Sequence, residues 1–318
     1  MRIATVVIDG TERVVIVDGS SALPLPRRVT VLDVLAMSPS ERDRLARESG
    51  EEAVPWSGLT VLPPIRPTTL RDYMTFEQHL AGAIKWVNPG AAIAPEWYEA
   101  PCFYFTNPLA VVGHGDAVMF PPGCEVLDFE LELAVVLRSG GRDLTAEQAA
   151  ECIGGYTILN DWSARDIQSR EMKIGLGPVK GKDFASSLGP WIVTADELAP
   201  HVRGDRLDVN MTVSINGQVV GSDTALHMAW SFAEMIAYAS RGAWVQAGDV
   251  LGSGTCGGGC LAELWGWAGG QDPAPLRPGD TIVLEVEGIG QLANTLVAGV
   301  VPIPLPRARE FASGVRLR

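Results

Sequence analysis

Apolar and polar positions alternate over short stretches at the start of the chain, a pattern typical of strands. Residues 1–18 alternate on both sides of a turn, which predicts two strands. Residues 29–37 and 38–50 have the spacing of two short helices, and Ser38 or Ser40 is the expected cap of the second. The N-terminal segment is therefore predicted to be a small α+β unit.

A proline-rich stretch at residues 55–67 interrupts these patterns and has the composition of a connector. We therefore predict a small N-terminal region over residues 1–65 and a main domain over residues 66–318. The first region is too short to build much core alone, so we expect it to pack on the second.

The main domain is predicted to contain more strands than helices. The predicted segments are a helix at 72–86, a strand at 127–137, a helix at 145–153, a strand at 156–161, a hairpin around Asn216-Gly217, a helix at 224–242, and strands at 247–253 and 277–288. Their irregular order favours a strand-dominated, mixed α+β fold over a doubly wound one.

Composition narrows the class of protein. Of the 318 residues 47% are hydrophobic, which supports a sizeable core, and the formal charge is −13 without any Lys/Arg run. We therefore expect neither a nucleic-acid surface nor a membrane surface. The five cysteines are irregularly spaced, and no signal pattern or bilayer-length apolar run is present. A reduced, cytoplasmic setting is expected.

The segment LDFELELAVVL (127–137) places carboxylates on one face of a strand, because side chains alternate along a strand. Alternation by itself favours an exposed polar face for Glu130 and Glu132. The apolar continuation favours a buried strand, in which two carboxylates would need a cation such as Mg²⁺.

Further candidate chemistry follows the strand at 156–161. If a helix begins near Asp161, then Asp161, Arg165 and Gln168 share one face and could form a pocket wall. The alternative is that Asp161 only caps the helix. The spacing alone leaves both open.

Other single residues carry weaker signals. GPVKGKDF (177–184) lacks the spacing of a phosphate loop, which leaves Lys182 as a candidate cation for a substrate oxygen. His79 is a lone helical histidine, a kind that is usually structural. In the glycine-rich loop 252–264, Thr255 and Glu263 are the side chains with clear chemical use.

Four blocks in order resemble the fumarylacetoacetate hydrolase family over roughly residues 65–305. The blocks are FEQH (76–79), DFELELA (128–134), NDWSARDIQ with GxxxGKDF (160–184), and the GT…EL loop (254–264) followed by VEGIGQLANT (286–295). The resemblance implies a mixed β-roll with flanking helices, usually a homodimer, that acts on a small oxo acid.

The resemblance also implies roles for individual residues. The implied metal ligands are Glu130, Glu132 and Asp161, holding Mg²⁺, Mn²⁺ or Ca²⁺. His79 is the implied water-activating base, Glu263 orients it, and Lys182 stabilises an oxyanion. The implied substrate contacts are Arg165, Gln168, Lys182 and Thr255. The animal-type enzyme has a further ligand aspartate before its histidine. Here Thr75 is expected at that place, which would leave three carboxylates.

The implied activity is hydrolysis of a carbon–carbon bond in a 1,3-dicarbonyl acid resembling an acylpyruvate. A decarboxylase or tautomerase of a 2-oxo diacid such as oxaloacetate is the alternative, because it uses the same metal without water attack. A non-catalytic, metal-stabilised binding protein is a third interpretation.

Overall fold

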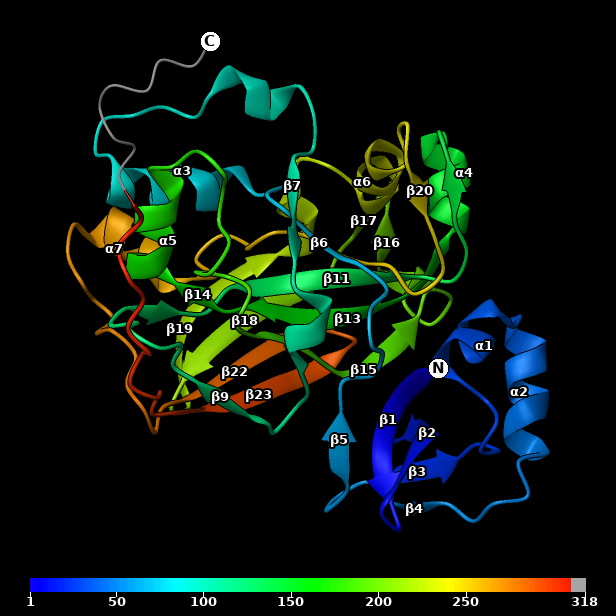
Figure 1. The fold of residues 1–318 in the computed structure, drawn as a ribbon. Coiled ribbons are helices and arrows are strands. Elements are labelled where there is room, and N and C mark those ends of the chain that lie inside the picture. Colours follow the sequence, from blue (N-terminus) through cyan, green and yellow to red (C-terminus); the bar gives the residue numbers. More distant parts are fainter. Residues whose placement is uncertain (310–318) are drawn as a thin grey trace.

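The computed structural model describes residues 1–309 and shows a strand-dominated α+β fold with helices around two sheets (Figure 1). The predicted fold class is confirmed. Its α-helices are α1 (Val31–Ala36), α2 (Pro39–Arg47), α3 (Glu77–Val87), α4 (Ala146–Glu151), α5 (Arg165–Met172), α6 (Phe232–Ala239) and α7 (Leu261–Ala268). Short 3₁₀ turns are η1 (Pro95–Tyr98), η2 (Pro108–Ala110), η3 (Ala199–His201) and η4 (Ala225–His227).

The larger sheet has the strand order β4-β3-β2-β1-β15-β13-β11-β21-β6-β7, with β5 beside β1 and β8 beside β15. Its strands are β1 (Arg2–Ile8), β2 (Thr11–Asp18), β3 (Ser21–Pro24), β4 (Val54–Pro55), β5 (Thr60–Leu62), β6 (Leu70–Tyr73), β7 (Phe103–Thr106), β8 (Val111–Val112), β11 (Leu131–Leu137), β13 (Ile153–Asp161), β15 (Ser186–Thr194) and β21 (Val250–Gly252). All seven residues of β11 are buried, as expected for a strand covered on both faces.

The smaller sheet has the order β19-β18-β22-β23-β9 and packs on β11, β13 and β15 of the larger one. Its strands are β9 (Ala117–Met119), β18 (Asn210–Ile215), β19 (Gln218–Thr224), β22 (Thr281–Val286) and β23 (Gly290–Val297). The remaining short pairs are β10 (Leu127–Asp128) with β14 (Ser163–Ala164), β12 (Gly141–Arg142) with β20 (Trp244–Val245), and β16 (Val202–Arg203) with β17 (Arg206–Leu207). Side chains of both sheets meet in one apolar core, which includes Leu133 and Ile282.

The N-terminal segment extends the larger sheet, because β1 pairs with β15 at Arg2↔Val193 and Ile3↔Ile192. The predicted pair of strands and pair of helices are present, and Ser38 caps α2 through a capping box with Glu41. One apolar cluster joins Ile3 to residues of β13, so this segment does pack on the rest of the chain. The division at residue 65 itself stays a prediction.

Two predicted helices are too long. Residues 70–73 form β6, which pairs in parallel with β21 and antiparallel with β7, and α3 begins only at Glu77. The helix predicted at 224–242 is limited to α6, because Ser231 caps it in a capping box with Glu234. Pairing and capping therefore override the apolar spacing of these segments.

Two predictions around the central strands are also corrected. The strand predicted at 127–137 is interrupted at residues 129–130, because β10 leaves the sheet to pair with β14. The helix expected near Asp161 begins at Arg165, and Asp161 is the last residue of β13.

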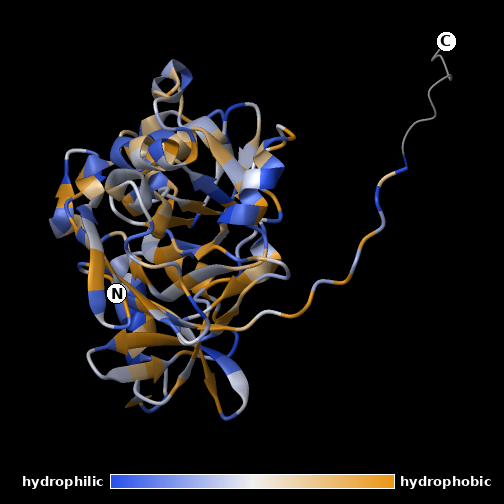
Figure 2. Cartoon of the chain, turned by 90° about the vertical axis from the view of Figure 1, so that its left-hand side faces the viewer, coloured by the Kyte–Doolittle hydropathy of each residue, from blue (hydrophilic) through white to orange (hydrophobic). Residues whose placement is uncertain are grey.

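Figure 2 shows the last described residues leaving the body of the protein as an extended segment without a helix or strand. Within residues 1–309 no helix has both the length and the apolar character needed to cross a membrane.

Candidate active site

The acidic side chains at the alternate positions 128, 130 and 132, around the interruption between β10 and β11, are buried in the protein. Asp128, Glu130 and Glu132 are 0%, 5% and 0% exposed. The backbone N–H of Glu130 donates to Oδ1 of Asn160 on β13 (2.9 Å), which holds the interrupted segment beside that strand. The interpretation of these carboxylates as a solvated strand face is therefore wrong.

Four carboxylates gather at one end of the central strands. Oxygens of Asp72, Glu130 and Glu132 lie within 4.8 Å of one another. Asp161 joins them through Lys182, whose Nζ donates to Oδ2 of Asp161 (2.5 Å) and to Oε2 of Glu130 (2.6 Å). The three predicted metal ligands are thus brought together, and Asp72 adds a fourth carboxylate.

Thr75 was expected at the place of a further ligand aspartate, which would have left three carboxylates. The structure instead brings Asp72 to the cluster as a fourth carboxylate. The Thr75 hydroxyl donates to the carbonyl of Ser253 (2.6 Å), so it is part of a backbone contact. Asp72 lies three residues earlier, on β6, and is 1% exposed. Its role was missed because the helix was predicted to begin at residue 72. The strand pairing that turns Asp72 inward joins distant parts of the chain.

The donor set of this cluster fits a hard divalent cation. Within this cluster three buried carboxylate oxygens accept no hydrogen bond from residues 1–309: Oδ1 of Asp72, Oε1 of Glu132 and Oδ1 of Asp161. Leaving such oxygens uncompensated is costly, whereas Mg²⁺, Mn²⁺ and Ca²⁺ take oxygen ligands of this kind. The cluster could therefore hold one such ion.

The electrostatics of the cluster point the same way. Burial, followed by the charges of Asp72 and Glu130, raises the pKa of Glu132 well above its usual range. Burial is also the largest cause that raises the pKa of Asp161, although Lys182 opposes it. For Glu130 burial opposes ionisation, but Lys182 and Arg165 outweigh it and lower the pKa. Like charges are crowded here, and a cation would relieve that crowding.

Tyr104 on β7 is a further residue that the sequence patterns did not single out. Its buried hydroxyl donates to Oδ2 of Asp72 (2.8 Å) and to Oδ2 of Asp161. Burial, then the charges of Asp161 and Asp72, raise the pKa of Tyr104, so the phenol stays a donor.

Arg165 is engaged within the protein. Its guanidinium donates to Oδ2 of Asp128 (2.8 Å), to Oε1 of Glu130 (2.8 Å) and to Oε1 of Gln168 (3.2 Å). The predicted alignment of Arg165 and Gln168 is therefore present, at the start of α5. Thr255 is 3% exposed, in the loop between β21 and α7.

His79 and Glu263 meet where α3 packs on α7, and Figure 1 shows both helices on the side of the molecule where α5 lies. Nδ1 of His79 lies 3.3 Å from Oε2 of Glu263, and both side chains are buried. The same oxygen accepts from the N–H of Gly258 (2.8 Å), and Oε1 accepts from Nε1 of Trp267 (3.2 Å). Burial would raise the pKa of Glu263, but its hydrogen bond with His79 and the charge of that ring lower it.

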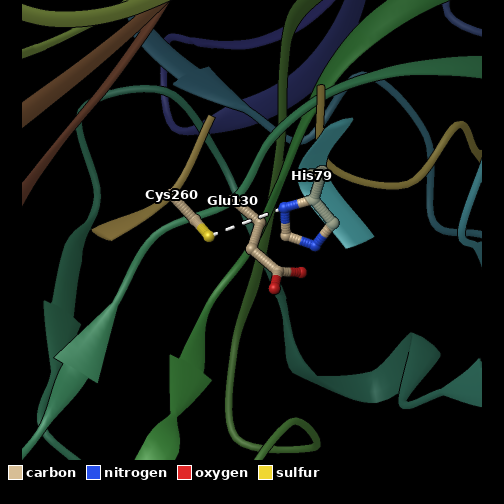
Figure 3. Close-up of side chains that lie close together, drawn as sticks. All are labelled: His79, Glu130 and Cys260. Carbon is tan, nitrogen blue, oxygen red and sulfur yellow. Dashed lines mark hydrogen bonds between the residues drawn. The ribbon is translucent and has the colours of Figure 1, made fainter. Parts of the chain in front are cut away.

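Cys260 lies against the same imidazole. Its Sγ accepts from the N–H of Glu263 (3.4 Å), which caps α7, and is 3.7 Å from Nδ1 of His79. Figure 3 shows the thiol and the Glu130 carboxylate beside the His79 ring. The irregular spacing of the five cysteines gave no signal for this contact.

Comparisons with known proteins agree with the mixed β fold. A family model described as "Fumarylacetoacetate (FAA) hydrolase C-terminal" matches residues 69–297. The chain belongs to the fumarylacetoacetate hydrolase family.

Individual relatives differ in the reaction that their names state. The chain is 30% identical to fumarylacetoacetase of Bos taurus over 277 residues, covering 69% of this chain and 66% of the bovine protein. It is 34% identical to oxaloacetate tautomerase YisK of Bacillus subtilis over 199 residues, covering 62% of each. The solved fumarylacetoacetate hydrolase of Exiguobacterium antarcticum matches with a TM-score of 0.72 at 26% identity, covering 94% of this chain and 99% of that one.

Proposed function

We propose that the protein hydrolyses a carbon–carbon bond in a 1,3-dicarbonyl acid resembling an acylpyruvate or fumarylacetoacetate. One observation carries this proposal: His79 and Glu263 form a buried pair, 3.3 Å apart, beside the carboxylate cluster. A base held in one orientation next to a cation site is the arrangement that water attack on a carbonyl requires.

In this proposal His79 removes a proton from water. Glu263 accepts a hydrogen bond from Nδ1–H, which leaves Nε2 unprotonated as the acceptor for that proton. The lowered pKa of Glu263 keeps its carboxylate ionised, so it can stabilise the imidazolium that forms. The hydroxide then attacks the distal carbonyl carbon, and the carbon–carbon bond breaks with its electron pair leaving on the oxo-acid fragment as an enolate. The proton held by His79 returns to that carbon, so the products are a carboxylic acid and an oxo acid.

The cation would be Mg²⁺, Mn²⁺ or Ca²⁺, held by Glu130, Glu132 and Asp161 together with Asp72, and it supplies Lewis-acid stabilisation of negative charge on the substrate. Lys182 carries a pKa above its ordinary value, because Asp161 and Glu130 outweigh the opposing effect of burial, so it stays a charged donor for an oxyanion. We assign substrate contacts to Arg165, Gln168, Lys182 and Thr255.

A tautomerase or decarboxylase of a 2-oxo diacid such as oxaloacetate is the second candidate. It is supported by the 34% identity to oxaloacetate tautomerase, which exceeds the 30% identity to fumarylacetoacetase but covers less of the chain. Such a reaction would use the same cation and needs no attacking water.

Replacement His79→Ala separates these functions. The wild type and the variant are assayed with Mg²⁺ or Mn²⁺. Three reactions are measured: hydrolysis of a panel of acylpyruvates, tautomerisation of oxaloacetate and decarboxylation of oxaloacetate. We expect the wild type to hydrolyse an acylpyruvate. The rate of hydrolysis should be lower in the variant by about 100-fold or more, which is the usual contribution of a general base. Undiminished hydrolysis in the variant would contradict the role of His79. Oxaloacetate turnover without any hydrolysis would establish the second candidate, and no turnover at all would favour a binding protein.

We also propose that the enzyme is a homodimer in the cytoplasm, with a main domain beginning near residue 66. The five cysteines are free thiols, as a reducing compartment would maintain them.

A further inference from the structure

Three potential ligands of different chemical type converge beside the carboxylate cluster. Ligand atoms of His79, Glu130 and Cys260 lie within 4.8 Å of one another, and the three residues are 5%, 5% and 0% exposed. They come from α3, from the turn between β10 and β11, and from the residue that caps α7 (Figure 3). The carbon–carbon hydrolysis proposed above uses the first two and leaves the thiol without a role.

We propose that His79, Glu130 and Cys260 form a second, inhibitory metal site, which takes a thiophilic divalent ion such as Zn²⁺. The site shares Glu130 with the carboxylate cluster. Metal binding here is independent of the proposed function, whereas the inhibition rests on the assignment of His79 as the base.

The separation between Sγ of Cys260 and Nδ1 of His79 suits a tetrahedral ion. Zn–S bonds of about 2.3 Å and Zn–N bonds of about 2.0–2.1 Å place the two ligand atoms about 3.6 Å apart at a tetrahedral angle. Sγ of Cys260 lies 3.7 Å from Nδ1 of His79. The Glu130 carboxylate is the third ligand, and three protein ligands leave the fourth position to water.

Ligand type separates this site from its neighbour. The cluster of Asp72, Glu132 and Asp161 offers only oxygens, which suit Mg²⁺ and Ca²⁺. A set containing one sulfur and one imidazole nitrogen instead favours Zn²⁺, Co²⁺ or Cd²⁺. Burial and the nearby Asp128 raise the pKa of the Cys260 thiol, so without an ion it stays protonated. Coordination replaces that proton, which leaves to solvent.

An ion in this site would stop turnover because it would bind both His79 and Glu130, which the proposed reaction uses. An ion bound to Nδ1 of His79 takes the place of the proton shared with Glu263. The neutral ring then carries its proton on Nε2, so Nε2 can no longer accept one from water. Glu130 would be drawn from Lys182, which it contacts at 2.6 Å. Zn²⁺ should therefore inhibit even when Mg²⁺ is saturating.

The test is a titration of the full-length, Mg²⁺-loaded protein with Co²⁺, following the near-ultraviolet absorption that a thiolate–Co²⁺ bond produces. Cys260→Ser removes the sulfur while serine remains a good helix cap. The matched control is Cys256→Ser, another fully buried thiol of the same loop that does not belong to this group. We expect the band in the wild type and in the control, and its loss in Cys260→Ser.

Affinity for Co²⁺ in Cys260→Ser should fall by more than about 100-fold, the upper end of what loss of a supporting contact costs. In the activity arm, the Zn²⁺ concentration for half-inhibition should rise in Cys260→Ser and stay unchanged in the control. If Cys260→Ser is unfolded by circular dichroism, His79→Gln replaces it, and Co²⁺ affinity should again fall.

Absence of the band in the wild type at millimolar Co²⁺, or an equal band in Cys260→Ser, would overturn the site. A band that disappears only in Cys256→Ser would overturn it as well. A protein that shows the band but hydrolyses none of the acylpyruvates would retain the metal site and refute only the proposed reaction.

Discussion

Gly82 of α3 and Gly266 of α7 bring the two helices into backbone contact: a Cβ on Gly266 would lie 2.0 Å from the carbonyl oxygen of Gly82. A Cβ on Gly82 would in turn lie 2.5 Å from Cγ of Glu263. Both helices need glycine at the crossing, because no larger residue fits between their backbones. The distance between His79 and Glu263 therefore depends on two residues that carry no side chain.

Gly266→Ala should separate α3 from α7 and weaken the His79–Glu263 pair. Alanine favours a helix over glycine by about 1 kcal/mol, but overpacking a tight contact costs about 1–3 kcal/mol, and this contact involves backbone. We expect a net loss of unfolding free energy, measured by urea denaturation, with a fall in kcat. Gly270→Ala is the control, because its Cβ would meet no atom within 4 Å. Equal effects of the two variants would contradict the role of the crossing.

Asp72→Asn should weaken binding of Mg²⁺ or Mn²⁺ by about 10-fold or more, since one of four clustered carboxylates loses its charge. Isothermal titration calorimetry measures this directly. Asp9→Asn, in the turn between β1 and β2 with φ 49°, is the control for loss of one negative charge, because asparagine tolerates that conformation. Unchanged affinity in Asp72→Asn would remove this residue from the cation site.

Without a divalent ion, the thermal midpoint of unfolding should rise as the pH is lowered from 8. Glu132 and Asp161 have raised pKa values when folded, so the folded state binds more protons than the unfolded state. This effect stabilises the fold as pH falls through the raised values, and it is complete near the ordinary carboxyl pKa of about 4. Scanning calorimetry after chelation, from pH 8 to 5, measures the slope.

Saturating Mg²⁺ should reduce that pH dependence, because the ion stabilises the ionised carboxylates. Glu132→Gln should reduce it in the chelated protein. Parallel curves with and without Mg²⁺ would show that these carboxyls are not the ion's ligands.

Tyr104→Phe should destabilise the chelated protein by about 1–3 kcal/mol, the cost of leaving buried acceptors without their donor. The hydroxyl donates to both Asp72 and Asp161, so two carboxylates lose a partner. Urea denaturation measures the change. Tyr156→Phe is the control, since the Tyr156 hydroxyl makes no hydrogen bond to residues 1–309. A similar loss in both variants would attribute the effect to packing alone.

Local signals predicted much of the fold. The cap at Ser38, the helix that begins beside Thr145 and the hairpin at Asn216-Gly217 depend on residues close together in sequence, and all three are present. The strand at 70–73 could not be predicted in this way. Its partners β21 and β7 join it from elsewhere in the chain, and its own residues continue the apolar spacing of α3.

The same distinction between local signals and long-range contacts applies to the residues of the candidate site. Convergence of Glu130, Glu132 and Asp161 followed from motifs whose order resembles a known family. Asp72 and Tyr104 reach the cluster only through the pairing of β6 with β7, which brings Asp72 opposite Tyr104. Cys260 faces His79 because α7 crosses α3, a tertiary contact that spacing along the chain does not encode.

Lys182 donates to Glu130 and Asp161 from a position that is 4% exposed. Its ammonium is a covalently attached counter-charge, present from the moment the chain is synthesised. The acidic interior can therefore close around this ammonium without an inorganic ion. A divalent ion bound by Glu130 and Asp161 would compete with Lys182 for the same two carboxylates.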